Sequence, residues 1–388
     1  ARRMSCSNNF KQIGLAVHNY HSSYNQLPIQ GSGTNSINNS QGFGEGGGNI
    51  TSGGGRNSRR LSMLVALTPF FEQQAIWEMI SNPSRQNTTG TTMTGSWSAM
   101  GPNPWVQDGY VPWATEIATL RCPSDPGTGL PAQGRTNYAA CLGDGHYVYQ
   151  LTNPASNGQT TGQYHSLATL AQVAERTRIG HRGMFKPRHA MRFRDTLDGL
   201  SNTIMAGEIA TDLGDRDIRT DLRVISGSSF SAPNGTDSYA NPGQCGDSAD
   251  PTRPQFWGPS VARNNANGNL INRSDDRRGY RWADWGPMFS GFFTILPPNS
   301  ASCILSHNGS VYGGPMSASS RHQGGAHILM GDGAVKFITD SIEAGNSAAA
   351  IPYYYDNTNS NLVGAASPYG LWGALGSRAA KEVIDQEF

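Results

Sequence analysis

The stretch of sequence that decides the fold occupies residues 6–27 and reads CSNNFKQIGLAVHNYHSSYNQL. Its apolar residues recur at spacings of three and four, which places them on one stripe of an α-helix. Cys6 extends the stripe, and Pro28 ends the helix. We therefore expect residues 1–30 to form an amphipathic helix that lays this stripe on the rest of the chain. The stripe consists of Phe10, Ile13, Val17, Tyr20, Tyr24 and Leu27.

The chain after this helix changes character twice. Residues 31–60 are rich in Gly, Ser and Asn, which predicts a flexible loop. Residues 61–81 are again helical in pattern, with Thr68 as the N-cap and Pro69 at the first helical position. From there on, Pro, Gly and Asn interrupt the sequence roughly every eight to twelve residues, as between antiparallel strands. The predicted class is α+β, with an N-terminal helix packed on a large antiparallel β-sheet body with long loops, residues 61–388.

One hairpin is clear in the sequence. Two apolar runs, residues 326–330 and 334–338, flank the turn Gly331-Asp332-Gly333. Asp332 can cap the turn amides, and His322 can reach either the hairpin backbone or the Asp332 carboxylate. His322 is then a structural clamp, a ligand or metal contact, or a catalytic group. Residues 371–384 have the pattern of a short helix.

Composition excludes several classes of protein. Charged residues make up 15% of the 388 residues and the net charge is +1, so a strongly electrostatic nucleic-acid binder is not expected. No run approaches the ~20 apolar residues of a membrane span. The 35 aromatic residues (8 Trp, 14 Tyr and 13 Phe) argue against disorder. G-x-S-x-G, H-E-x-x-H, S-x-x-K and Walker motifs are missing, so we expect no enzymatic activity and no cofactor.

The five cysteines are widely spaced and form no C-x-x-C motif. They indicate either disulfides in an oxidising compartment or buried free thiols. If disulfides form, our expected pairs are Cys122–Cys141 and Cys245–Cys303. Cys6, on the packing stripe of the helix, is then the unpaired thiol.

Several short motifs occur in a fixed order along nearly the whole chain. Together they resemble the bacterial prepilin-type family with an H-x9-DG signature, also called domain of unknown function 1559. Here the signature is His322 with Asp332 and Gly333. The other motifs are residues 6–21, Thr68-Pro69-Phe70-Phe71-Glu72-Gln73-Gln74, Cys122-Pro123-Ser124-Asp125, Thr136-Asn137-Tyr138, residues 198–204 and Gly207-Glu208.

The resemblance implies an export route and an architecture. Family members carry a type IV prepilin leader and a hydrophobic helix before the position of Ala1. The stripe over residues 6–27 would then be the outer half of a pilin-like helix. We expect an exported structural subunit at the cell surface that assembles with copies of itself into a filament, tube or lattice. The alternative is a membrane-anchored surface protein that binds glycans or solutes.

Three groups of residues are further candidates for chemistry. Asp198 and Asn202 are expected to bond local backbone amides. Glu208 is either a buried carboxylate that faces His322 or an arginine, or a residue that only stabilises the fold. A third group holds Ca²⁺ or pairs with neighbouring arginines in a surface loop. It consists of Asp212, Asp215, Asp217 and Asp221.

Two further patterns relate to the binding alternative. Tyr280 and a set of tryptophans either stack on sugars or fill an aromatic core; the tryptophans are Trp257, Trp282 and Trp285. A basic run over residues 176–194 either faces an anionic polysaccharide, lipid headgroup or nucleic acid, or forms a solvated face or subunit contact.

Overall fold

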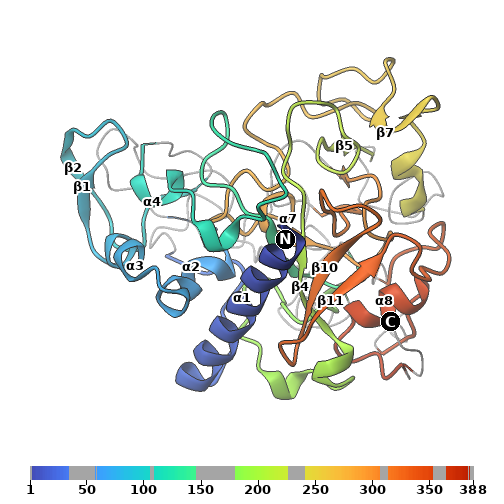
Figure 1. The fold of residues 1–388 in the computed structure, drawn as a ribbon, viewed down its shortest axis with the longest axis horizontal. Helices are drawn as coiled ribbons and strands as arrows, with labels where there is room; N and C mark the ends of the chain where they lie inside the picture. The colour runs from blue at the N-terminus through green and yellow to red at the C-terminus, as the bar shows by residue number, and fades with distance from the viewer. Residues whose placement is uncertain are drawn as a thin grey trace, which may run out of the picture.

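The structure is a computed structural model that describes residues 2–34, 57, 59–104, 109–145, 180–225, 241–305, 313–352, 364–382 and 384. Within these residues the fold is mixed α/β, with an N-terminal helix lying against a body of several small sheets and long loops (Figure 1). The large antiparallel sheet that the sequence predicts is not found, because the largest sheet has five strands and is mixed. Most of residues 31–60, the predicted flexible loop, lie outside the described part of the chain.

The five-stranded sheet has the order β11-β10-β4-β3-β8. Its first three pairings are antiparallel, whereas β3 and β8 are parallel, with Ala140 opposite Gly291. The predicted hairpin over residues 326–338 is confirmed as the pair β10–β11. The strands are β3 (Tyr138–Cys141), β4 (Ile204–Glu208), β8 (Gly291–Phe292), β10 (Gly325–Met330) and β11 (Val335–Thr339).

Both faces of this sheet are buried, each in a different cluster. Side chains alternate along a strand, so Tyr138 and Ala140 of β3 pack in the cluster that contains the inner residues of helix α1 (Arg2–Tyr24). Ala139 and Cys141 pack in the second cluster with helix α8 (Gly370–Gly376). The sheet is therefore a layer between the N-terminal helix and the C-terminal helix.

The stripe of α1 faces the body as predicted along most of its length. Phe10, Ile13 and Val17 are fully buried. The Phe10 ring meets the Tyr138 ring edge to face, with 4.4 Å between the ring centroids. The helix ends at Tyr24, before Pro28, because Asn25 adopts a left-handed conformation with φ 53°. Tyr24, the last residue of the helix, is 60% exposed.

The helix predicted over residues 61–81 is broken into three pieces. Thr68 does not cap a helix, because its hydroxyl donates back to the Val65 carbonyl. Glu72, with φ 65°, separates the second piece from the third. The pieces are α2 (Met63–Leu67), the 3₁₀-helix η2 (Thr68–Phe71) and α3 (Gln74–Ser81).

The remaining described elements are short, since Pro and Gly interrupt them. Three two-stranded sheets pair β1 (Ser84–Gln86) with β2 (Thr92–Trp97), β5 (Arg223–Val224) with β9 (Cys303–Ile304), and β6 (Ala249–Asp250) with β7 (Arg253–Trp257). The short helices are α4 (Val111–Ala114), η3 (Ala118–Leu120), η5 (Phe193–Asp195), η6 (Leu200–Asn202), η7 (Pro242–Gly246) and α7 (Pro287–Ser290). Among the described helices, none combines the length and apolar character needed to cross a membrane.

Candidate functional site beneath helix α1

A row of side chains crosses four neighbouring strands on the face of the sheet that lies under α1. Tyr138 of β3 is opposite Glu208 of β4, and His327 of β10 is opposite Phe337 of β11. Gly207 of β4 is opposite Ile328 of β10, so the next residue of β4, Glu208, lies beside the preceding residue of β10, His327. The antiparallel register therefore lines up a phenol, a carboxylate, an imidazole and a phenyl ring.

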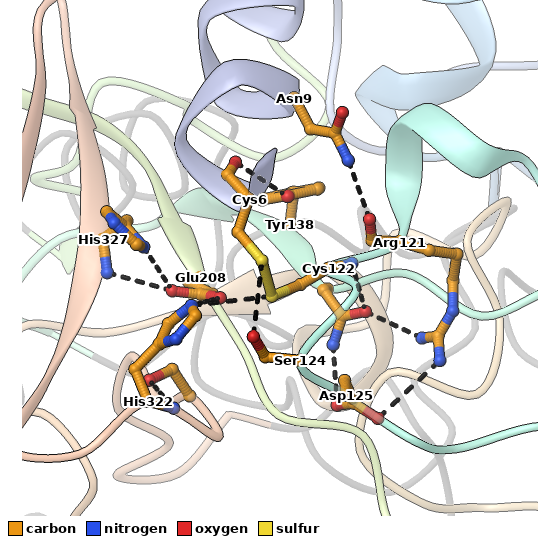
Figure 2. Close-up of a disulfide and its surroundings, with 12 residues drawn as sticks. Cys6, Asn9, Arg121, Cys122, Ser124, Asp125, Tyr138, Glu208, His322 and His327 are labelled. Atoms are coloured by element: carbon orange, nitrogen blue, oxygen red, sulfur yellow. Dashed lines mark hydrogen bonds and ion pairs between the residues drawn. A yellow bond between two sulfur atoms is a disulfide. The ribbon is translucent and has the colours of Figure 1, made fainter. Parts of the chain in front are cut away.

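Glu208 is the centre of this row and is 1% exposed. Its Oε2 accepts hydrogen bonds from His327 Nδ1 at 2.9 Å and from the His327 backbone N–H at 3.1 Å. Its Oε1 lies 3.1 Å from Nε2 of His322, which comes from the loop before β10 (Figure 2). Burial raises the pKa of Glu208, but the hydrogen bonds and charges of the two histidines outweigh burial and lower it. Glu208 is therefore buried and faces His322.

A disulfide joins α1 to the body directly beside this row. Cys6 of α1 is bonded to Cys122, and Cys122 Sγ lies 3.6 Å from His322 Nε2. The predicted pair Cys122–Cys141 is wrong: Cys141 is a buried free thiol on the opposite face of the sheet. Strand alternation turns Cys141 toward α8, whereas the helical stripe turns Cys6 toward Cys122. The second disulfide, Cys245–Cys303, forms as expected.

Asn137 fixes the loop that carries Cys122. Its Oδ1 accepts hydrogen bonds from the Cys122 backbone N–H at 2.9 Å and from Arg121 Nη1 at 2.8 Å. Its Nδ2 donates to Asp125 Oδ2 at 2.8 Å and to the Ile209 carbonyl at 2.9 Å. One amide side chain therefore ties the Cys122 loop to the residues that follow β4.

Further contacts bind α1 to the same region (Figure 2). The Tyr138 hydroxyl donates to the Cys6 carbonyl at 3.0 Å, and Asn9 Nδ2 donates to the Arg121 carbonyl at 2.8 Å. The Arg3 guanidinium lies over the Phe337 ring, 3.4 Å from its centroid. The first turns of α1 are thus held by a covalent bond, two hydrogen bonds and a cation–π contact.

The residues of the H-x9-DG signature do not meet. His322 and Asp332 lie beyond opposite ends of β10, and His322 contacts Glu208 instead of the Asp332 carboxylate. Asp332 Oδ1 accepts from the Ala334 N–H at 2.9 Å, so it caps the turn, and Gly333 supplies the φ of 90° that the turn requires.

Asp198 makes long-range bonds in place of the local ones expected. It accepts from the backbone N–H groups of Ala380 and Lys381 at 2.8 and 2.7 Å, and from the Ser377 hydroxyl at 3.3 Å. Its role is therefore to anchor the segment after α8. Asn202 stays local, since its Nδ2 donates to the Asp198 carbonyl at 3.4 Å.

Three carboxylates of the acidic loop contact arginines. Asp217 is bonded to Arg219 and Arg321, Asp221 is paired with Arg263 and Arg277, and Asp212 Oδ2 lies 3.8 Å from Arg277 Nε. Asp215 Oδ1 accepts from the Asp217 N–H. Pairing with arginines therefore agrees with the structure, but the predicted surface loop does not, because Asp212, Asp217 and Asp221 are buried. The four residues form no metal-binding group within the described residues.

The tryptophans proposed for sugar stacking are core residues. Trp257, Trp282 and Trp285 are at most 1% exposed, and Tyr280 is 4% exposed. A sugar cannot stack on rings that are covered by protein, so this route to glycan binding is incorrect. Of the basic run, residues 176–179 lie outside the described part of the chain.

Sequence reasoning missed the role of His327 and the partner of Cys6. His327 is a polar residue within an apolar strand, and that contrast was the available signal for a buried partner. Cys6 on the inner stripe of a helix was a signal for a covalent contact with the body. Neither signal identifies the partner, which depends on strand register and on the docking of α1.

The family model described as a protein of unknown function, DUF1559, matches residues 1–345. The chain belongs to the DUF1559 family. No curated protein and no solved structure shows significant similarity to it.

In this DUF1559 protein, residues from five motifs that are far apart in the sequence converge under α1. Cys6, Cys122, Asn137, Glu208 and His322 come from five separate segments and form one connected cluster. Its chemistry in the disulfide form is that of a clamp, since the groups hold one another. Cys6, Cys122, Glu208 and His322 are also the one group among the described residues with the donor atoms to hold a metal ion.

Proposed function

We propose that this DUF1559 protein is a non-enzymatic, exported structural subunit that assembles with copies of itself at the bacterial cell surface. The observation that carries the proposal is the contrast between the two sides of α1. The inner side is clamped to the body through Cys6 and the buried stripe. The outer side is exposed and carries two apolar side chains among polar ones, Met4 at 70% and Leu15 at 63% exposure.

Met4 and Leu15 lie on the same side of the helix. They are eleven residues apart, which is about three helical turns, and both point away from the buried stripe. Apolar side chains on a helix surface lose contact with water when a second copy covers them. A helix that is already held by a disulfide loses little further freedom on association, so the clamp favours a stable subunit contact.

Export has its own support. Cys6–Cys122 and Cys245–Cys303 are the kind of bond that persists in oxidising compartments. A net charge of +1 also allows many copies to pack with little mutual repulsion.

The test is sedimentation velocity of the full chain and two matched variants. Leu15→Glu places a charge on the outer side of α1 and should shift the distribution from assemblies to monomers. Leu197→Glu is the control, because Leu197 is 64% exposed and lies outside α1. If both variants assemble equally, the outer side of α1 is not part of the contact between subunits.

One cavity favours the second candidate, a surface protein that binds an anionic solute. It has a volume of about 520 Å³ and is lined by several cations with one acid, Asp195. Calorimetric titration with an anionic oligosaccharide should give heat in the wild type that Arg194→Gln with Lys381→Gln removes. Absence of heat in the wild type would count against it. The cations are Arg182, Arg194, Arg378 and Lys381.

A further inference from the structure

We propose that reduction of the Cys6–Cys122 disulfide creates a binding site for one Zn²⁺ ion, with Cys6, Cys122, His322 and Glu208 as the ligands. Their donor atoms all lie within 4.8 Å of one another. Two sulfurs, an imidazole nitrogen and a carboxylate oxygen are a ligand set that Zn²⁺ accepts in tetrahedral geometry. Within the described residues no second group of this kind occurs, and Cys245–Cys303 is not part of one.

The spacing of the donors fits a tetrahedron. Zinc bonds of about 2.3 Å to sulfur and about 2.0–2.1 Å to nitrogen or oxygen require a sulfur–nitrogen edge of about 3.6 Å and a nitrogen–oxygen edge of about 3.3 Å. The distance from Cys122 Sγ to His322 Nε2 is 3.6 Å, and that from His322 Nε2 to Glu208 Oε1 is 3.1 Å. Two edges are therefore already near the required length.

Two changes are needed: donor pairs near the 4.8 Å limit must draw together, and the two sulfurs must separate. In a tetrahedral site they would lie about 3.8 Å apart, a distance that follows from the zinc–sulfur bond length. Asn137 holds the Cys122 backbone, so we expect the Cys6 side chain to make most of the movement. The Ser124 hydroxyl oxygen lies 4.0 Å from Cys6 Sγ and is placed to donate to a thiolate there.

Outer groups orient the ligands. His327 occupies Glu208 Oε2 through its ring and its backbone N–H, which leaves Oε1 directed at the sulfurs and His322. The His322 backbone N–H donates to the Ser320 hydroxyl at 2.9 Å. Hydrogen bonds to the ligands of a zinc ion fix the geometry of those ligands.

The step balances with a dithiol as the reductant. The dithiol supplies two electrons and two protons, becomes a disulfide, and leaves Cys6 and Cys122 as thiols. Zn²⁺ then displaces both thiol protons to solvent. His322 binds the ion through Nε2 as a neutral ring with its proton on Nδ1, and the proton that Nε2 carries in the metal-free chain leaves through solvent.

The experiment uses the full chain under anaerobic conditions. One sample stays oxidised, and the other is reduced with a dithiol that is then removed. Each sample is titrated first with Co²⁺ and then with Zn²⁺. The reduced chain should bind one Co²⁺ with thiolate-to-metal charge-transfer absorption, and Zn²⁺ should abolish that absorption. The oxidised chain should show none. His322→Gln and Glu208→Gln should each weaken binding at least tenfold.

Controls separate this site from the other thiols. Cys245→Ser with Cys303→Ser should keep the absorption, and Cys6→Ser with Cys122→Ser should abolish it. Circular dichroism follows whether the reduced wild type stays folded. If that chain shows no charge-transfer absorption, the proposal is overturned in either state. Unchanged affinity in folded His322→Gln overturns the assigned ligand set.

Discussion

The reactivity of the Cys141 thiol tests how tightly the side chains around this residue are packed. The thiol is fully buried, and burial raises its pKa to about 12, so almost no thiolate forms at neutral pH. We predict that iodoacetamide labels no cysteine in the native, unreduced chain. After unfolding without reduction it should label one cysteine, identified as Cys141 by peptide mass spectrometry. Label on Cys6 would contradict the pairing of Cys6 with Cys122.

Asp217 gives a pH dependence at the same scale. Burial raises its pKa, but the hydrogen bonds and charges of Arg219, together with the charge of Arg321, outweigh burial and lower the pKa. A folded-state pKa below the unfolded value of about 3.9 stabilises the fold above that value, and this stability is lost as the pH falls through the folded-state pKa. In the Asp217→Asn variant, the free energy of unfolding should fall less steeply as the pH is lowered below about 4. Urea denaturation at a series of pH values measures this. An unchanged slope would contradict this.

Sequence reasoning at the residue scale succeeded where chemistry was local and failed where it was not. Asp332 in its turn was predictable, because an Asp-Gly turn between apolar runs specifies its own hydrogen bonds. Asp198 was not, because its partners lie in the segment after α8. His322 was recognised as important, yet the choice of Glu208 over Asp332 follows from strand register.

The two disulfides are the element-scale feature with the largest expected effect on stability. Cys6–Cys122 closes a loop of 116 residues and Cys245–Cys303 one of 58. The chain-entropy model gives about 4.7 kcal/mol for a loop of about 100 residues. Replacing both Cys6 and Cys122 by Ser should therefore lower the unfolding free energy by several kcal/mol.

The second disulfide is the matched control. Halving the loop length reduces the entropic contribution by about 0.6 kcal/mol, so Cys245→Ser with Cys303→Ser should destabilise by a similar but slightly smaller amount. Urea denaturation of both double variants checks this. A Cys6/Cys122 variant as stable as the wild type would show that the bond does not clamp α1.

At the element scale, periodicity predicted which side of α1 is buried but not where it ends. The end depends on Asn25, which takes a left-handed conformation that the apolar pattern does not reveal. Residues 61–81 show the same limit, since the left-handed conformation of Glu72 separates η2 from α3 and the apolar pattern does not reveal it. The β10–β11 hairpin was predictable because its turn chemistry and strand pattern agree.

At the scale of the whole molecule, a mixture of helix and β structure was predictable, whereas the predicted large antiparallel sheet was wrong. Short strands separated by Pro and Gly indicated β structure, but the parallel pairing of β3 with β8 joins segments about 150 residues apart and has no local signal. The convergence of the five motif segments under α1 likewise depends on long-range contacts and has no local signal in the sequence.

Electron microscopy of the purified oxidised chain tests self-assembly through α1 most directly. We predict ordered polymers or lattices, with the outer side of α1 at the contact between subunits in the reconstructed map. Isolated, uniform particles under every condition of concentration and salt would contradict the claim.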